Sequence, residues 1–80
     1  MNPAVFEKVR SIAADILKIN SSALSADSSP ATVDTWDSVQ HLNLVLALEE
    51  SFGLQFSPEE MDEMKNLRRI AGIVESKTAA

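Results

Sequence analysis

A serine with an acidic neighbour and a nearby histidine is the part of this 80-residue chain best suited to chemistry. Ser38 follows Asp37 directly, and His41, the single histidine, comes three residues later. Positions three apart share a helix face, so Ser38 and His41 could form a hydrolytic nucleophile–base pair. Such a hydrolase would also need an orienting acid and an oxyanion hole in a pocket, for which a thin bundle offers little room. We therefore expect His41 to be a surface or contact residue and the chain not to be an enzyme.

Ser38 has two further interpretations. A serine at a helix start usually caps the first turn. Asp37 is also a good N-cap, and Gln40 three residues on completes an Asp-x-x-Gln variant of the capping box. Capping by Asp37 would leave Ser38 pointing outward at the helix N-terminus, where the dipole and free N–H groups favour a phosphate. The residues thus allow Ser38 either to cap or to carry a phosphodiester.

Other kinds of site find little support. The chain has no cysteine and one histidine, which excludes disulfides and a structural zinc site. Asp27 and Asp34 lack the alternating ligands and central glycine of a calcium loop, so no metal is expected. The adjacent pairs Glu49-Glu50 and Glu59-Glu60 would point apart as solvated faces. No glycine-rich phosphate loop and no basic aromatic patch for nucleic acid occurs in the sequence.

Charge is distributed unevenly along the chain, whose net charge is −5. Residues 25–64 contain nine acidic residues and no lysine or arginine, whereas the segments on either side are net basic. A surface of one sign repels nucleic acid and anionic lipid and steers basic protein partners. A purely solubilising surface is the alternative, but the lack of any basic residue over this span favours partner binding.

The sequence as a whole predicts helices, with no alternation of apolar and polar residues typical of strands. We expect helices over residues 3–18, 38–52, 58–65 and 67–77. Asn2, Asp37, Ser57 and Asn66 suit the N-caps, and Gly53 suits a left-handed residue that ends the second helix. The expected fold is all-α: a four-helix bundle with a short third helix, in one domain over 1–80 with a core of about 3–77 and a frayed tail over 78–80.

A long connection over residues 19–36 joins the first two helices. It is rich in serine, asparagine, aspartate and proline, which favour turns. A loop of this length in a small domain must be functional or held to the core. We expect Ile19, Leu24, Val33 and Trp36 to hold it there.

The second helix has more apolar residues than one buried stripe requires. One ridge is made by Leu44, Leu48 and Phe52, with Val45 beside it. A second ridge contains Ser38, Leu42 and Leu46. If the first ridge faces the core, Leu42 and Leu46 lie exposed beside the serine and resemble a docking surface. Alternatively, they fill a small helical core.

The stretch from Asp37 to Leu54 resembles the Asp-Ser region, with its later Glu-x-x-Phe, of acyl carrier proteins. Residues 56–60 and 66–67 fit that family's link and the starts of its third and fourth helices, so the resemblance covers about 3–77. It implies an acyl-carrier-type bundle in which Ser38 carries 4′-phosphopantetheine and Asp37 is the flanking motif residue. A phosphopantetheinyl transferase would move the group from coenzyme A, using Mg²⁺.

The resemblance also implies that the protein catalyses nothing itself. The thiol of the arm would hold acyl intermediates as thioesters while loading, elongating or transferring enzymes act on them. Basic, apolar patches on those enzymes would meet the expected partner-binding residues, which are Val39, His41, Leu42, Leu46, Glu49, Glu50, Glu59 and Glu60. We expect a cytoplasmic monomer without a signal peptide, membrane insertion or nucleic-acid binding.

One segment departs from the resemblance. Carriers of fatty-acid synthesis usually have Leu-Gly-x before Asp-Ser, and peptidyl carriers Gly-Gly, whereas this chain has Asp34-Thr35-Trp36. We therefore expect a specialised stand-alone carrier, whose cargo could be a fatty acyl, polyketide or aminoacyl group or one bound for a surface lipid or polysaccharide. The alternative function is an unmodified acidic adaptor that binds a basic partner through Leu42 and Leu46.

Overall fold

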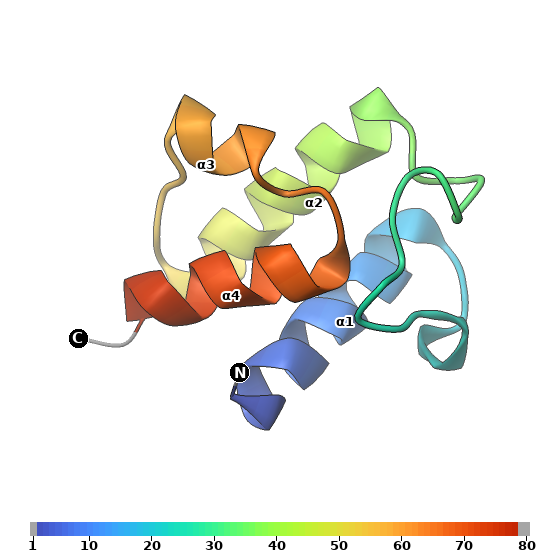
Figure 1. The fold of residues 1–80 in the computed structure, drawn as a ribbon, viewed down its shortest axis with the longest axis horizontal. Helices are drawn as coiled ribbons and strands as arrows, with labels where there is room; N and C mark the ends of the chain where they lie inside the picture. Colours follow the sequence, from blue (N-terminus) through green and yellow to red (C-terminus); the bar gives the residue numbers. More distant parts are fainter. Residues whose placement is uncertain (1, 79–80) are drawn as a thin grey trace.

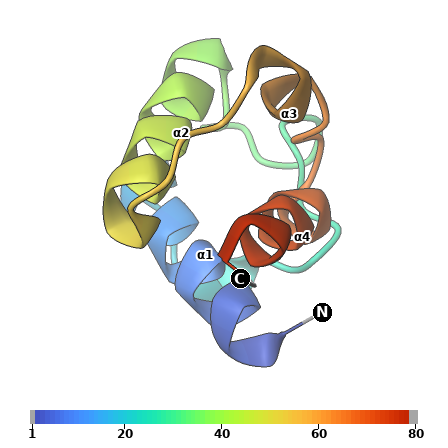
Figure 2. The same cartoon turned by 90° about the vertical axis from the view of Figure 1, so that its left-hand side faces the viewer.

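The computed structural model describes residues 2–78, which form four α-helices and one short 3₁₀ helix. In chain order these are α1 (Pro3–Leu17), η1 (Ser21–Ala23), α2 (Ser38–Phe52), α3 (Pro58–Asp62) and α4 (Leu67–Thr78). α1 packs against both α2 and α4. The four α-helices surround a common centre, with the short α3 beside the link into α4 (Figures 1 and 2). The predicted all-α, four-helix architecture is confirmed.

Each α-helix begins at a side chain that accepts a hydrogen bond from the first turn. The predicted caps Asn2, Asp37, Ser57 and Asn66 all do so, at 2.8–3.2 Å. Ser57 forms a complete capping box with Glu60, whose carboxylate accepts from the Ser57 N–H at 2.7 Å. These bonds satisfy amides that have no acceptor within the helix.

The box predicted at α2 is only half formed. Asp37 Oδ1 accepts from the Gln40 N–H at 2.8 Å, as expected. The Gln40 side chain, however, turns along the helix, and its Oε1 accepts from Asn43 Nδ2 at 3.0 Å. The reciprocal part of the prediction is therefore wrong, and Asp37 alone makes the side-chain cap.

Several element bounds differ from the predictions for local reasons. α1 ends at Leu17 because Lys18 adopts the left-handed conformation, with φ 58°. α3 ends at Asp62 rather than residue 65, because the chain then turns Met64 into the core, where it is 3% exposed. α4 extends to Thr78, whose hydroxyl donates to the Val74 carbonyl at 2.9 Å. The rest of the expected frayed tail, residues 79–80, lies outside the described residues.

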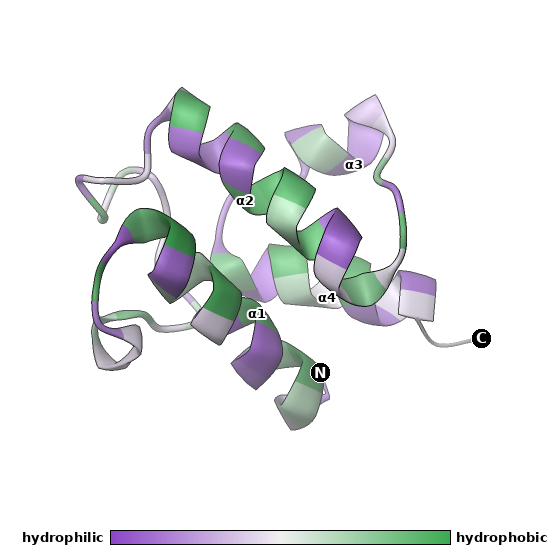
Figure 3. Cartoon of the chain, turned by 180° about the vertical axis from the view of Figure 1, so that it is seen from behind, coloured by the Kyte–Doolittle hydropathy of each residue, from purple (hydrophilic) through white to green (hydrophobic). Residues whose placement is uncertain are grey.

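The core combines one face of each long helix with three residues of the connection. Its fully buried large side chains are Val9, Leu17, Trp36, Leu44, Leu48, Leu67, Ile70 and Val74. The predicted ridge of Leu44 and Leu48, with Val45 beside it, faces this core, and Phe52 packs partly against it. Hydrophobic positions nevertheless occur around much of α2, beyond the side that faces the core (Figure 3).

The connection between α1 and α2 is held in place, as predicted. Leu24, Val33 and Trp36 are buried, and Ile19 packs partly against the core. Sequence reasoning did not predict the next anchor, which is the N-terminus of α4. There the N–H groups of Leu67 and Arg68 donate to carbonyl oxygens of the connection, at 3.1 and 2.9 Å.

A charged contact and a buried hydroxyl reinforce this anchor. Arg68 forms an ion pair with Asp27 of the connection at 2.8 Å. Ser28 is buried, and its Oγ accepts from the Ser25 N–H at 2.8 Å. The path of the connection is therefore fixed from α4, and this path determines where the chain enters α2.

Candidate functional site

Ser38 is the first residue of α2 and is exposed. Asp37 precedes it in an extended conformation and occupies the N-cap position. The His41 N–H donates to the Asp37 carbonyl at 2.8 Å, which completes the first turn. Among residues 2–78, none of the hydrogen bonds involves the Ser38 hydroxyl. The structure thus decides between the two sequence interpretations: Asp37 caps, and the Ser38 side chain is free.

The start of α2 suits an attached phosphate. In the first helical turn, the N–H groups of the leading residues have no acceptor within the helix and carry the positive end of the dipole. The Asp37 side chain accepts a hydrogen bond from one of these amides, that of Gln40. The amides of Ser38 and Val39 precede it, next to the Ser38 hydroxyl, so a negatively charged oxygen on Ser38 would meet favourable partners.

His41 contacts Trp36, a pairing that sequence reasoning did not predict. Trp36 Nε1 donates to His41 Nδ1 at 3.1 Å, and the two rings lie 20° from parallel with centroids 6.1 Å apart. Trp36 is only 2% exposed, and partial burial lowers the pKa of His41 below its ordinary value. His41 is therefore a neutral contact residue at pH 7.

The same contact argues against a hydrolytic pair. Since the indole N–H can only donate, the Nδ1 atom of His41 must present its lone pair to Trp36. The neutral ring then carries its proton on Nε2 and has no second lone pair with which to deprotonate Ser38. In a serine hydrolase, an acid instead accepts a hydrogen bond from one ring N–H of the histidine. The other ring nitrogen is then unprotonated and can accept the proton of the serine hydroxyl.

A mainly apolar groove of about 810 Å³ lies beside Ser38. α2 contributes Ser38, His41 and Leu42 to it, and Trp36 and Asp37 contribute from the approach to the helix. The remaining lining comes from the connection (Ser29, Pro30, Ala31) and from the link between α3 and α4 (Met64, Lys65). The serine hydroxyl is thus next to a surface that can contact the apolar parts of a group attached to it.

Three large apolar side chains are exposed on α2. Val39, Leu42 and Leu46 are 65%, 58% and 61% exposed. The prediction that Leu42 and Leu46 lie outside the core is confirmed, and the alternative that they fill it is wrong. Together with Ser38 they form a strip along α2, which we call the α2 strip.

The acidic residues expected to bind partners differ in their surroundings. Glu49 is partly buried, and its Oε2 accepts from the Phe56 N–H at 2.9 Å. Glu60 accepts from the Ser57 N–H and forms an ion pair with Lys77 at 3.1 Å, and the Ser57 hydrogen bond is the main cause of its lowered pKa. Glu50 and Glu59 are exposed. The carboxylates of Glu49 and Glu60 therefore already make contacts within the fold.

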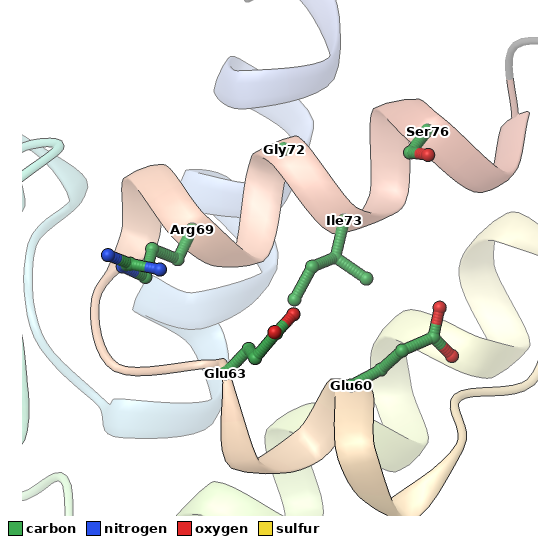
Figure 4. Close-up of a pocket in the computed structure, with 6 residues that line it drawn as sticks. All are labelled: Glu60, Glu63, Arg69, Gly72, Ile73 and Ser76. Carbon is green, nitrogen blue, oxygen red and sulfur yellow. The ribbon is translucent and has the colours of Figure 1, made fainter.

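A smaller hollow of about 310 Å³ lies between α3 and α4. Its lining includes Glu60, Glu63, Arg69 and Ile73 (Figure 4). Ser38 does not line it, and Glu60 already has partners there. Within residues 2–78, no three His, Cys, Asp or Glu side chains come together to hold a metal ion. Among the described helices, none has the length and apolarity needed to cross a bilayer.

Comparison with known proteins shows which family the chain belongs to. A family described as a phosphopantetheine attachment site matches residues 7–74. The acyl carrier protein of Thermosynechococcus vestitus is 32% identical over 76 residues, which cover 95% of this chain and 94% of that protein. The chain belongs to the acyl carrier protein family. The acyl carrier protein of Clostridium acetobutylicum is likewise similar, at 31% identity over 74 residues, covering 92% and 96% of the two chains.

A solved structure supports the same family fold. The solution structure of a holo acyl carrier protein from Geobacter metallireducens superposes with a TM-score of 0.85 at 28% sequence identity, covering 94% of this chain and 86% of that one. Acyl carrier proteins hold acyl groups on phosphopantetheine and do not catalyse reactions themselves. Membership also implies contact with a phosphopantetheinyl transferase and with enzymes that handle acyl groups.

Proposed function

We propose that this acyl carrier protein is modified at Ser38 Oγ with 4′-phosphopantetheine. The observation that supports the proposal is that Asp37 and Ser38 have different roles at the start of α2. Asp37 caps the helix, with its Oδ1 2.8 Å from the Gln40 N–H, while Ser38 is exposed and its hydroxyl is free among the described residues. The phosphate would sit at a helix N-terminus, and the adjoining apolar groove offers room for the arm. The residues present therefore fit the group.

The chain's own part in the modification is to present the hydroxyl. A bond forms between Ser38 Oγ and the β-phosphorus of coenzyme A, and the bond from that phosphorus to the leaving 3′,5′-ADP breaks. The transferase must take the hydroxyl proton, because His41 uses its free lone pair to accept from Trp36. When bound, the group supplies a terminal thiol that holds acyl cargo as a thioester.

The α2 strip is the proposed docking surface for the transferase and for enzymes that handle the cargo. Val39, Leu42 and Leu46 expose apolar area that the fold does not use, and the exposed carboxylate of Glu50 lies on the same helix. Basic enzymes with an apolar patch match this combination. Glu59 of α3 is a further exposed acid for such partners.

We place the carrier in the cytoplasm, as a monomer in which the whole chain forms one domain. Trp36 supports a specialised stand-alone role, since it is buried at the position directly before Asp37, where the sequence departs from the usual fatty-acid and peptidyl carriers. The structure adds that Trp36 forms one wall of the groove beside Ser38. The cargo class would then depend partly on this indole.

Modification by a broad-specificity phosphopantetheinyl transferase, with coenzyme A and Mg²⁺, tests the proposal. Intact mass should show one phosphopantetheine on the wild type and none on Ser38→Ala, with equal thermal melts for the two proteins. Ser51→Ala is the matched control, because Ser51 is an exposed serine at the other end of the same helix, and it should be loaded like the wild type. An unmodified wild type, or a loaded Ser38→Ala protein, would refute attachment at Ser38.

The same assay separates a carrier from an unmodified adaptor. Leu46→Arg should lower the loading efficiency (kcat/KM) about tenfold or more, because burying an exposed leucine in an interface contributes roughly 1.5–3 kcal/mol. Ser51→Arg places the same charge on α2 away from the strip and should load normally. An adaptor would instead bind its basic partner equally well with Ser38→Ala and lose it with Leu46→Arg.

A further inference from the structure

His41 has a hydrogen-bonding group that the bundle does not use. Its Nδ1 edge faces the buried indole of Trp36, 3.1 Å from Nε1. The opposite edge of the ring therefore faces away from Trp36 and carries the Nε2–H. Among residues 2–78, none of the hydrogen bonds involves Nε2. His41 is nevertheless held in a defined orientation, because the indole hydrogen bond restricts its ring.

His41 shares the groove with Ser38. Both residues line it from α2, and positions three apart on a helix have Cβ atoms about 5–6 Å from each other. A phosphodiester on Ser38 Oγ extends further from the helix than the hydroxyl, into the reach of an imidazole on the same face. The other charged groups that line the groove are Asp37 and Lys65.

We propose that His41 is a positioning residue for the attached arm: its Nε2–H donates to the phosphodiester on Ser38, and Trp36 fixes the tautomer and ring orientation that make this possible. The inference rests on the proposed attachment at Ser38. It gives Trp36 a second role besides core packing. The arm would then leave the protein along the groove in a preferred direction, with the phosphate held between the α2 amides and His41.

A charge on Ser38 must alter the titration of His41 if the two groups are close. The unmodified serine is neutral, whereas a phosphodiester carries one negative charge. At about 6 Å through solvent, that charge alone raises the pKa of His41 by about half a unit. A direct hydrogen bond from Nε2–H brings the charge closer and should raise the pKa by clearly more, whereas a histidine that only packs against Trp36 would show no more than the through-solvent rise.

NMR on the unmodified and the loaded protein tests the inference. Loading is first confirmed by intact mass, and imidazole ¹⁵N shifts then report the tautomer and the pKa of His41. We expect the Nε2–H tautomer in both states, a pKa that rises on loading by more than the through-solvent shift of about half a unit, and a ³¹P shift of the phosphodiester that titrates with the same midpoint. A loaded protein whose His41 pKa rises by about half a unit or less would overturn the inference alone, whereas failure to load would refute the attachment and the inference with it.

Variants separate positioning from packing. His41→Gln is loaded to completion with excess transferase, as intact mass confirms, and the loaded variant should lack the ³¹P inflection at the histidine midpoint. Lys65→Gln, which removes the cationic group of the groove, should keep that inflection. Trp36→Phe keeps a large apolar ring but removes the indole donor, so His41 should populate both tautomers and its rise in pKa on loading should shrink. An inflection that survives His41→Gln would exclude His41 as its source and refute the proposal.

Discussion

Replacing Asp37 should weaken α2 by an amount that its cap geometry predicts. The carboxylate accepts from the Gln40 N–H at 2.8 Å and makes the side-chain cap of this helix alone, since Gln40 does not complete the box. Loss of an N-cap acceptor costs about 1 kcal/mol, and loss of the negative charge at the dipole adds roughly 0.3–1 kcal/mol. For a domain of this size, 1 kcal/mol lowers Tm by about 4–8 °C. Asp37→Ala should therefore melt at least that much below the wild type.

Asp37→Asn separates the cap from the charge. Asparagine retains an acceptor for the Gln40 amide, so this variant should lose only the dipole contribution and melt between the wild type and Asp37→Ala. The assay is thermal unfolding followed by circular dichroism, together with the initial rate of phosphopantetheine loading at 25 °C. Because a frayed first turn misplaces Ser38, loading should slow in Asp37→Ala more than in Asp37→Asn. Equal melting of all three proteins would refute the capping argument.

Two helix C-termini and one carboxylate give the remaining predictions. Gly53 ends α2 with φ 65°, and an added Cβ would meet no atom within 4 Å, so Gly53→Ala should lower the free energy of unfolding by about 1 kcal/mol through backbone strain alone. Lys18 ends α1 with φ 58°, so Lys18→Gly should raise that free energy by about 0.5–1 kcal/mol in urea titrations, and a decrease would contradict the strain argument. The pKa of Glu60 is lowered mainly by the Ser57 N–H, so its contribution to stability is complete above the ordinary value of 4.5 and is lost as pH falls through the folded-state pKa. Glu60→Gln should flatten the acid side of the stability–pH curve, and an unchanged curve would count against this assignment.

The features that sequence predicted correctly depend on short-range chemistry. A cap needs one side chain and an amide two or three residues away, and a left-handed end is favoured by one glycine. For this reason Asp37, Ser57 and Gly53 were assigned correctly. The exposure of Leu42 and Leu46 followed from helical periodicity, once one ridge was assigned to the core. The free Ser38 hydroxyl was one of the two interpretations that the cap at Asp37 allowed, and the structure selects it.

The features that sequence missed depend on the path of the connection. Trp36 meets His41 only because the chain approaches α2 from one direction. That direction is set by the amides of Leu67 and Arg68, which donate to carbonyls about 40 residues earlier in the chain. No local pattern marks such backbone acceptors, so the sequence predicted that Trp36 packs on the bundle but not which side chain it orients.

The proposed role of the exposed apolar strip of α2 is contact with other proteins. Burying a leucine or valine contributes roughly 1.5–3 kcal/mol, so a fold that needed Val39, Leu42 or Leu46 for its own stability would cover them. The core is already closed by Leu44 and Leu48 on the opposite side of the helix, both 0% exposed. The strip begins at Ser38, within two residues of the buried Trp36. One rigid helix thus presents the proposed attachment residue and an apolar surface on the same side, so that an enzyme docked on the strip would reach the arm from a fixed direction.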